Sequence, residues 1–303
     1  MKLLPFYLAF SMTLSAMSQE LPTVKFGSID RIENFQTKLI SPRNIDIWLP
    51  DGYTRDKKYK VVYMHDGQML FDAANTWNKT AWEADDTFGK LMLEGKIQDC
   101  IIVGVWNVEL RHADYFPQKI INQIPESTRK IIQENQLKGA PMADNYLKFL
   151  VSELKPFVDE KYSTLPEAES TFMIGSSMGG LISLYGLCEY PNIFGGVACL
   201  STHSPIASYE LIDENTDRDV ASKFRTYLTN NLPSANSKKI YFDFGDQTGD
   251  AFYKPYQTKI DKIMIEKGFD DSSWKTLFFE GENHSEISWA KRLEIPVLFL
   301  LGK

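Results

Sequence analysis

A glycine-rich segment at 171–180, which reads TFMIGSSMGG, constrains the fold of this chain more than any other feature. An apolar run of strand type ends at Gly175, Ser177 lies at the centre of a Gly-x-Ser-x-Gly pattern, and a helical stretch follows at 181–188. This order predicts a sharp strand-to-helix turn that exposes a serine hydroxyl, with free N–H groups of the helix directed at it. Glycines suit such a turn because a Cβ atom would collide with the neighbouring backbone. We therefore interpret Ser177 as a candidate nucleophile; the alternative is a glycine-rich turn with a structural role only.

Strand-like and helical stretches alternate along most of the chain, with helical spacing at 143–158 and 252–267. Such alternation predicts an α/β fold with a mostly parallel central sheet and helices on both of its faces. Two short strand-like runs near the start, at 37–40 and 44–49, predict an antiparallel hairpin at the sheet edge. Further strands are predicted at 60–64, 100–106, 172–175, 196–200, 239–244 and 274–279.

The N-terminus has the pattern of a secretory signal peptide. A charged residue precedes a mostly apolar run at 3–17, and Ala16 and Ser18 supply the small residues of a cleavage site. We predict a signal peptide over 1–18 and one α/β domain over 19–303, and hence a secreted or periplasmic protein. The alternative is a buried N-terminal helix. No later segment is apolar for long enough to cross a bilayer, so no stable membrane anchor is predicted.

The charge balance narrows the classes of partner. Acidic residues outnumber basic ones by 40 to 33, which gives a formal net charge of −7. We therefore expect no nucleic-acid partner, whereas a neutral small molecule or oligosaccharide is compatible with this charge. The sequence makes no prediction of oligomeric state.

A nucleophilic serine needs a base, and the chain offers four histidines. Where this type of turn carries the nucleophile, the acid and then the base follow it in the chain, which leaves His203 and His284. His284 directly follows the last predicted strand, at the carboxyl end where parallel sheets place their chemistry, so we predict it as the base. His203 is expected to line the cleft. The acid should follow the strand 239–244, in a loop where spacing leaves Asp246 and Asp250 as alternatives.

Two backbone N–H groups are needed to stabilise the negatively charged oxygen of an acyl-transfer intermediate. The first is predicted at Met178, directly after the serine, and the second in the loop after an earlier strand. The segment 64–69 reads MHDGQM, and its Gly67 allows close backbone approach, so we predict the N–H of Gln68 as the second donor. The same sequence is also typical of an ordinary turn. No histidine and carboxylate cluster has zinc spacing, so no metal or other cofactor is predicted.

From about residue 44 onwards, several ordered blocks resemble the putative esterase family of α/β hydrolases. This family includes enterochelin esterases, feruloyl and acetylxylan esterases, S-formylglutathione hydrolases and mycobacterial mycolyltransferases. The blocks lie at 62–71, 103–117, 143–162, 174–185, 244–256 and 279–301. The resemblance implies the α/β-hydrolase fold for the domain at 19–303.

The resemblance also implies roles for individual residues. It makes Ser177 the nucleophile, His284 the base, and Met178 and Gln68 the oxyanion donors. For the acid it favours Asp250 over Asp246, because relatives often show glycine, a few polar residues and then aspartate before an aromatic residue. The acidic residue directly after Gly245 departs from that pattern.

Together these features predict a secreted serine esterase that cleaves a carboxylic ester through an acyl-enzyme. A carbohydrate-linked acetyl or feruloyl ester is the first substrate class, and a siderophore ester and acyl transfer to another hydroxyl are alternatives. A catalytically inactive binding protein that keeps the fold is the alternative of another class. The polar stretches 118–142 and 208–237 are expected to lie over the site, and the sequence makes no prediction of whether they act as lids. The expected substrate-binding residues are His65, Asp66, Arg111, His203 and Trp106.

Overall fold

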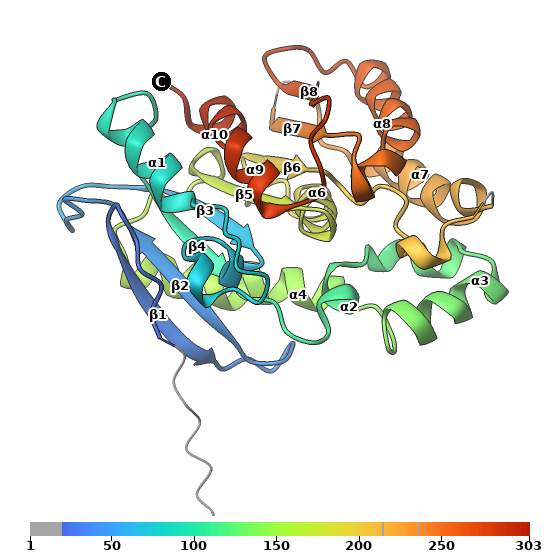
Figure 1. The fold of residues 1–303 in the computed structure, drawn as a ribbon, viewed down its shortest axis with the longest axis horizontal. Helices are drawn as coiled ribbons and strands as arrows, with labels where there is room; N and C mark the ends of the chain where they lie inside the picture. Colours follow the sequence, from blue (N-terminus) through green and yellow to red (C-terminus); the bar gives the residue numbers. More distant parts are fainter. Residues whose placement is uncertain (1–19, 214, 236) are drawn as a thin grey trace, which may run out of the picture.

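A single mixed sheet organises the described part of the chain, which comprises residues 20–213, 215–235 and 237–303 of a computed structural model (Figure 1). Within these residues the strands are β1 (Ser28–Phe35), β2 (Arg43–Leu49), β3 (Lys60–His65), β4 (Cys100–Val105), β5 (Thr171–Ser176), β6 (Gly196–Leu200), β7 (Lys239–Phe244) and β8 (Trp274–Phe278). Their order across the sheet is β1-β2-β4-β3-β5-β6-β7-β8. β1 and β2 pair antiparallel, β2 joins β4 antiparallel, and the other pairs are parallel. The predicted mostly parallel sheet is therefore confirmed.

The N-terminal hairpin exists, but its first strand was misplaced by the sequence pattern. The prediction at 37–40 is wrong: these residues form the bend that leads into β2, and the strand is Ser28–Phe35. This edge strand carries charged side chains such as Arg31, and much of it is exposed, so it lacks the apolar run of an interior strand. Arg31 nevertheless has a buried partner, since its Nε and Nη2 donate to the carboxylate of Asp46 at 2.6 and 2.8 Å.

Helices cover both faces of the sheet, as predicted. They are α1 (Ala84–Leu93), α2 (Arg111–Tyr115), α3 (Glu126–Ile131), α4 (Ala143–Phe149), α5 (Lys155–Lys161), α6 (Met178–Glu189), α7 (Ser222–Asn231), α8 (Lys254–Glu266), α9 (Glu286–Arg292) and α10 (Glu294–Leu301). A π-helical turn joins α4 to α5, so the helix predicted at 143–158 is continuous. The predicted signal peptide over 1–18 lies outside the described residues. Among those that are described, none of the helices is both long and apolar enough to span a membrane.

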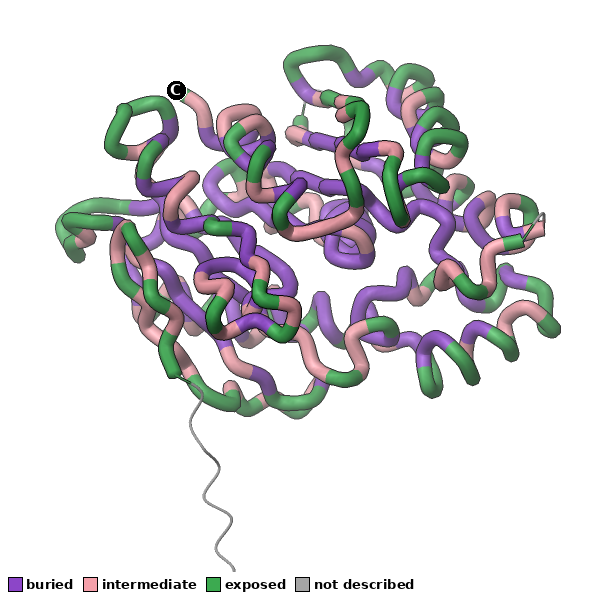
Figure 2. The backbone as a smooth tube through the Cα atoms, in the orientation of Figure 1, coloured by how far each residue is buried: buried purple, intermediate pink, exposed green. Residues whose placement is uncertain are grey.

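Successive side chains of the central strands point to opposite faces of the sheet, and this divides the core into two layers. In β3, Val61 and Tyr63 pack with residues of α4 to α8, whereas Val62 and Met64 pack with residues of α1, α9 and α10. Figure 2 shows the buried residues concentrated along these inner strands. Because both faces are covered, the strands are apolar throughout, and only their carboxyl ends are left open for polar chemistry.

The turn between β5 and α6 has the strained backbone that the glycine pattern predicts. Ser177 has φ 56° and ψ −122°, a conformation that non-glycine residues rarely adopt. The strand and helix approach so closely that a Cβ on Gly175 would lie 2.4 Å from the carbonyl carbon of Gly179. A Cβ on Gly180 would lie 3.0 Å from Thr202 Oγ1. These glycines therefore permit the close packing that holds Ser177 at the tip of the turn.

The elbow packing makes a testable prediction for stability. In Gly175→Ala the new Cβ would meet backbone atoms that cannot rotate away, so we expect the free energy of unfolding in urea to fall by about 3 kcal/mol. Gly186→Ala on the same helix is the control, because its Cβ would meet the mobile ends of Leu147 and Met173 at 2.9 Å. We expect a loss below about 1 kcal/mol there, since alanine also favours the helix. Equal losses in the two variants would contradict this account.

Candidate active site

Three parallel strands, β5 and the adjacent pair β7 and β8, bring the predicted nucleophile, acid and base to one edge of the sheet. Ser177 follows β5, Asp250 lies in the loop after β7, and His284 lies in the loop after β8. The last two loops are joined by a bridge between Gln247 and Asn283, and the N–H of Gln247 donates to Glu282 O at 3.1 Å. The carboxyl ends of the strands therefore hold residues that are far apart in the sequence in one cleft.

His284 is oriented by Asp250. Its Nδ1 lies 2.6 Å from Asp250 Oδ1, and its backbone N–H donates to Thr248 Oγ1 at 2.9 Å. The other carboxylate oxygen, Oδ2, accepts from Ser201 Oγ and from the N–H of Gly245, both at 2.6 Å. Burial alone would raise the pKa of Asp250, but the hydrogen bonds from His284, Ser201 and the N–H of Gly245 hold it below its usual value. The carboxylate thus stays ionised and keeps the imidazole in the tautomer that carries its proton on Nδ1.

The hydrogen bond from Ser201 to this carboxylate has a fixed direction. Its Oγ accepts from Trp289 Nε1 at 3.0 Å and from Arg292 Nη2 at 2.8 Å. Indole and guanidinium N–H groups can only donate, so the single Ser201 proton is directed to Asp250. Arg292 also pairs with the buried Asp243 at 2.9 Å, which balances its charge. Ser201 was not predicted from the sequence, because a lone serine after a strand carries no distinguishing pattern.

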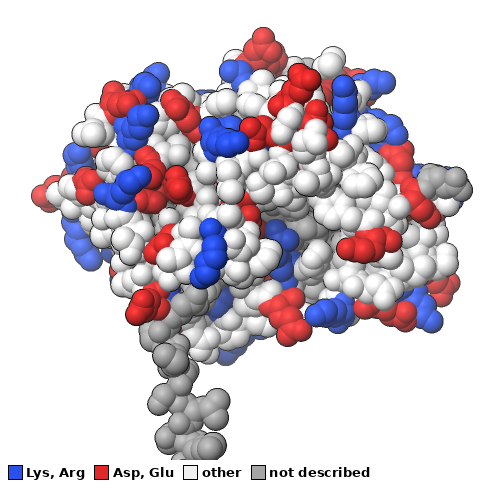
Figure 3. Space-filling model, viewed as in Figure 1, with Lys and Arg blue, Asp and Glu red and all other residues white. Residues whose placement is uncertain are grey.

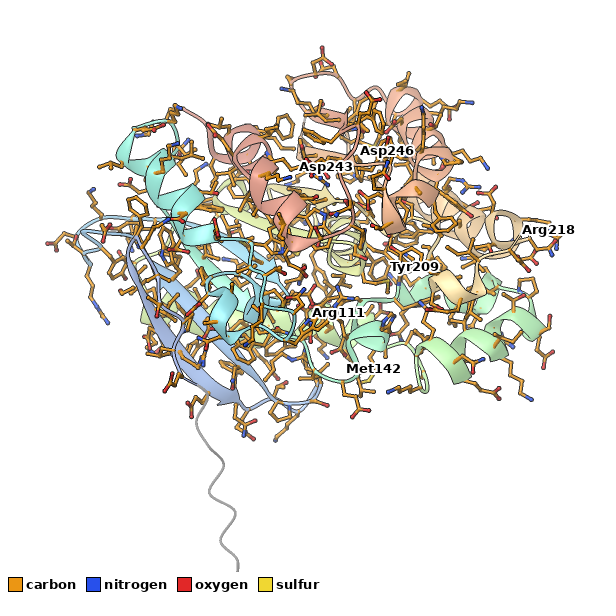
Figure 4. The ribbon with its side chains drawn as sticks, in the orientation of Figure 1. Arg111, Met142, Tyr209, Arg218, Asp243 and Asp246 are labelled. Carbon is orange, nitrogen blue, oxygen red and sulfur yellow. The ribbon has the colours of Figure 1, made fainter. Side chains whose placement is uncertain are left out.

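Asp246, the alternative acid, does not reach the imidazole. It accepts from Gln247 Nε2 and from the N–H of Gly281, both at 2.9 Å, and it is half-buried. Among the hydrogen bonds of the described residues, none joins Asp246 to His284. Figure 4 labels Asp246 on the loop after β7 and Asp243 within that strand. The structure therefore brings Asp250, rather than Asp246, to the histidine.

The loop that carries Gln68 is held against the neighbouring strand. A Cβ on Gly67 would lie 2.5 Å from the backbone of Gly104, so only glycine allows this approach. Asp66 adopts a left-handed conformation, with φ 58° and ψ 46°, and its carboxylate receives two hydrogen bonds of 2.7 Å from Arg111. Asn107 Nδ2 adds a third at 2.5 Å. Gln68 thus lies on a rigid turn beside the cleft, and Met178 is the first residue of α6.

Two pockets meet at Ser177 and Arg111. One, of about 530 Å³, is lined in part by residues 135–138 and 208–210, and the other, of about 510 Å³, contains His284. The first is lined by Glu109, Leu110, Arg111, His112, Asn135, Gln136, Leu137, Lys138, Ser177, Met178, His203, Ser208, Tyr209 and Glu210. The second is lined by Asp66, Gln68, Met69, Trp77, Asn78, Trp82, Asn107, Arg111, Ser176, Ser177, His284, Ser285, Glu286 and Trp289. Charges of both signs are dispersed around a largely uncharged centre of this face (Figure 3).

The two polar stretches over the first pocket are tied to each other. Gln136 Nε2 donates to Ile206 O at 2.8 Å, and Gln136 Oε1 accepts from the N–H of Ser208 at 2.9 Å. Both segments are partly helical, through α3 and the following π-helical turn and through α7. They therefore form a joint wall of the pocket.

Two of the expected substrate-binding residues do not line either pocket that contains Ser177. His65 is only 2% exposed, its Nδ1 bonds Tyr146 Oη at 2.8 Å, and burial lowers its pKa to about 4. Trp106 is half-buried; its Nε1 donates to Asp46 Oδ2 at 2.8 Å and Arg31 covers its ring. Both predictions are corrected, because the first side chain points into the core and the second is occupied by a buried ion pair. Asp66, Arg111 and His203 do line the pockets.

Two tyrosines beside the imidazole were missed by the sequence analysis. The rings of Tyr209 and Tyr253 meet the His284 ring edge-on, with centroids 6.1 and 5.6 Å away. Burial raises the pKa of Tyr209 to about 12, although its hydrogen bonds with Tyr253 and Ser177 act in the other direction. Tyr209 comes from the stretch 208–237, where no periodic pattern indicates which side chain faces the cleft (Figure 4). Among the hydrogen bonds of the described residues, none joins Ser177 directly to His284, although both line the second pocket.

The fold and the serine turn define an α/β hydrolase. The family described as Putative esterase matches residues 37–277, which is most of the chain. The chain therefore belongs to the putative esterase family, as the resemblance of its ordered blocks predicted. An uncharacterized protein of Bacillus subtilis, YbbA, is 24% identical over 160 residues, which are 52% of this chain. That match spans 56% of YbbA, so the chain covers little more than half of this relative.

Solved structures share the fold at low sequence identity. A ferulic acid esterase from the anaerobic fungus Anaeromyces mucronatus is 19% identical, with a TM-score of 0.62 over 92% of this chain and 93% of that chain. The enterobactin esterase of Shigella flexneri is 16% identical, with a TM-score of 0.63 over 92% of this chain and 60% of that chain. At these identities the likeness establishes the α/β-hydrolase fold, which confirms the prediction from the sequence.

The support of Asp250 by Ser201 predicts a shift in pH dependence. A carboxyl whose pKa is lower in the folded state stabilises the protein above its unfolded pKa, and this stability is lost as the pH falls through the folded pKa. Ser201→Ala removes a donor to Asp250 and so raises that folded pKa. We expect the free energy of unfolding at neutral pH to fall by about 2 kcal/mol, and its acid decline to begin at a higher pH.

The control for this measurement is Ser204→Ala. Ser204 is also buried, and among the described residues its hydroxyl donates to Thr202 O alone, at 3.2 Å. Urea unfolding between about pH 7 and pH 3 compares the two variants with the unaltered protein. An acid decline in Ser201→Ala that coincides with that of the control would contradict the assigned role.

Proposed function

We propose that the protein hydrolyses a carboxylic ester with Ser177 as nucleophile, His284 as base and Asp250 as the acid that orients it. The observation that carries this proposal is the 2.6 Å contact of His284 Nδ1 with Asp250, in a pocket that Ser177 also lines. Only Nε2 of the imidazole is then free to accept the serine proton. We expect the hydrogen bond from Ser177 to His284 to form when an ester is bound, since such contacts tighten in the substrate complex.

The reaction would proceed through an acyl-enzyme. Ser177 Oγ attacks the ester carbonyl carbon while His284 takes its proton, and the carbonyl oxygen gains negative charge. The N–H groups of Met178 and Gln68 are the proposed donors to this oxygen. His284 then protonates the leaving alcohol, and water releases the acid from Ser177. The rigid turn at Asp66 and the N-terminus of α6 support these two assignments.

For the substrate we propose an ester linked to a carbohydrate. Trp77 is 83% exposed and lines the second pocket, whereas Trp82 and Trp289 in the same pocket are 2% and 4% exposed. An exposed indole at the rim of a cleft offers an apolar face for a sugar or aryl ring. The likeness to a ferulic acid esterase supports this class. We also propose that the protein is secreted, on the basis of the apolar N-terminal run in the sequence.

The choice of acid can be tested with paired variants. Asp250→Asn leaves His284 without its charged partner, so we expect kcat for 4-nitrophenyl acetate to fall by about 10³–10⁴-fold. Asp246→Asn, on the same loop, should change kcat less than about threefold, because within the described part of the chain the Asp246 carboxylate bonds loop groups alone. A larger loss in Asp246→Asn than in Asp250→Asn would reverse the assignment.

The substrate class can be tested at Trp77. We expect Trp77→Ala to lower kcat/KM for a feruloylated or acetylated oligosaccharide by about tenfold, the upper range for one aromatic stacking contact. Hydrolysis of 4-nitrophenyl acetate, which is too small to reach the rim, serves as the control and should be unchanged. A catecholate siderophore ester belongs in the same panel. If that ester alone were hydrolysed efficiently, the carbohydrate assignment would be wrong.

A further inference from the structure

A chain of hydrogen bonds runs through three buried or half-buried side chains beside His284. His203 Nε2 contacts Ala207 O at 2.8 Å, and His203 Nδ1 contacts Tyr253 Oη at 3.0 Å. Tyr253 Oη in turn bonds Tyr209 Oη. The proposed ester hydrolysis gives no role to any of these three side chains.

The Ala207 carbonyl at one end of this series fixes the direction of each hydrogen bond in it. The carbonyl of Ala207 can only accept, so the proton of His203 lies on Nε2. Burial lowers the pKa of His203 to about 3, so the ring is neutral and its Nδ1 accepts from the Tyr253 hydroxyl. The Tyr253 oxygen must then accept from the Tyr209 hydroxyl. Toward the cleft, Tyr209 Oη can therefore act only as a hydrogen-bond acceptor.

This acceptor oxygen lies beside the reacting groups. Tyr209 and Ser177 line the same pocket, and the ring of Tyr209 meets the His284 ring edge-on. A Cβ on Gly249 would lie 2.4 Å from Tyr209 Oη and 3.2 Å from His284 Cγ, so one glycine packs against both. Tyr253, by contrast, is 1% exposed, and its hydroxyl is already engaged by His203, Tyr209 and Ser177. Tyr209 is therefore the member of the chain that a molecule in the cleft can meet.

We propose that Tyr209 positions the water that hydrolyses the acyl-enzyme, an inference that rests on the proposed function. A water molecule has two protons, and His284 Nε2 can accept only one of them. Tyr209 Oη would accept the other and so direct a lone pair of the water at the acyl carbon. Once Ser177 carries the acyl group it has no proton to offer, so the Tyr209 oxygen is available for this contact.

The step balances without any further reactant. The water oxygen forms a bond to the acyl carbon, and His284 Nε2 takes the first water proton. The tetrahedral intermediate collapses, the bond from carbon to Ser177 Oγ breaks, and His284 returns its proton to that oxygen. The second water proton stays on the new carboxylic acid. Tyr209 only accepts a hydrogen bond, because burial raises its pKa to about 12 and its phenol stays neutral at pH 7.

Methanol provides a sharp test, because as a nucleophile it has only one O–H proton, which goes to His284. The enzyme would be acylated with 4-nitrophenyl acetate and mixed with buffer with and without methanol, and acetate and methyl acetate would be quantified. We expect Tyr209→Phe to slow hydrolysis of the acetyl-enzyme by about tenfold and to spare methanolysis. The ratio of methyl acetate to acetate should therefore rise about tenfold, whereas a merely structural defect would slow both reactions alike.

Two further variants keep the test decisive. Tyr190→Phe, at the opposite end of α6 from Ser177, is the matched control and should leave the ratio unchanged. Tyr253→Phe frees the Tyr209 proton to point into the cleft, so the ratio should rise there too, by a smaller factor. It also carries the test if Tyr209→Phe does not fold.

The outcomes separate this inference from the proposed function. An unchanged ratio in Tyr209→Phe, or in Tyr253→Phe if only that variant folds, would overturn the role of Tyr209 while leaving the acyl-enzyme intact. If the unaltered protein formed no acetyl-enzyme at all, the proposed function itself would be wrong, and the role of Tyr209 with it.

Discussion

The hydrogen bond between His284 and Asp250 is the interaction on which the candidate site depends. It joins the loops after two adjacent strands, and it decides which imidazole nitrogen faces the cleft. The aspartate can serve in this way only because its second oxygen is saturated by Ser201 and by the N–H of Gly245. An unsupported buried carboxylate would take up a proton and lose the charge that orients the base.

The groups that support the candidate site are held in turn by elements of the core. Ser201 receives its two donors from α9, through Trp289 and Arg292, and α9 is packed against the sheet in one of the two core layers. On the other side of Ser177, Arg111 holds the Asp66 turn with two charge-assisted hydrogen bonds. The loop residues of the candidate site are therefore supported by contacts with elements of the core, which is the arrangement that precise chemistry needs.

The parts of this structure that follow from the sequence are those with a strict local requirement. Close backbone contact requires the glycines around Ser177, and burial on both faces requires apolar residues in the central strands. Both requirements leave a pattern that can be recognised in the sequence. The choice between Asp246 and Asp250 depends on how one loop turns, and the bridge between Gln247 and Asn283 that fixes it joins distant residues. The sequence pattern misplaced β1 because its charged side chains suit an exposed edge strand and leave no apolar run.

Side chains that act through long-range contacts leave no such signal. Tyr209 and Ser201 lie in segments whose local sequence is compatible with many orientations, and only the folded chain shows that they approach the histidine and its acid. His65 illustrates the converse error, since a histidine next to a predicted oxyanion loop looked functional and is packed inside the core. Spacing along the chain thus identifies elements more reliably than it identifies the direction of single side chains.

The most direct test of the central claim is the site and the acid dependence of covalent labelling by a fluorophosphonate. Peptide mapping after labelling should locate the phosphonyl group on Ser177, and the labelling rate should fall steeply when Asp250 is replaced by asparagine. Label on another residue, or a rate that does not change without Asp250, would contradict the proposal that these residues act together with His284.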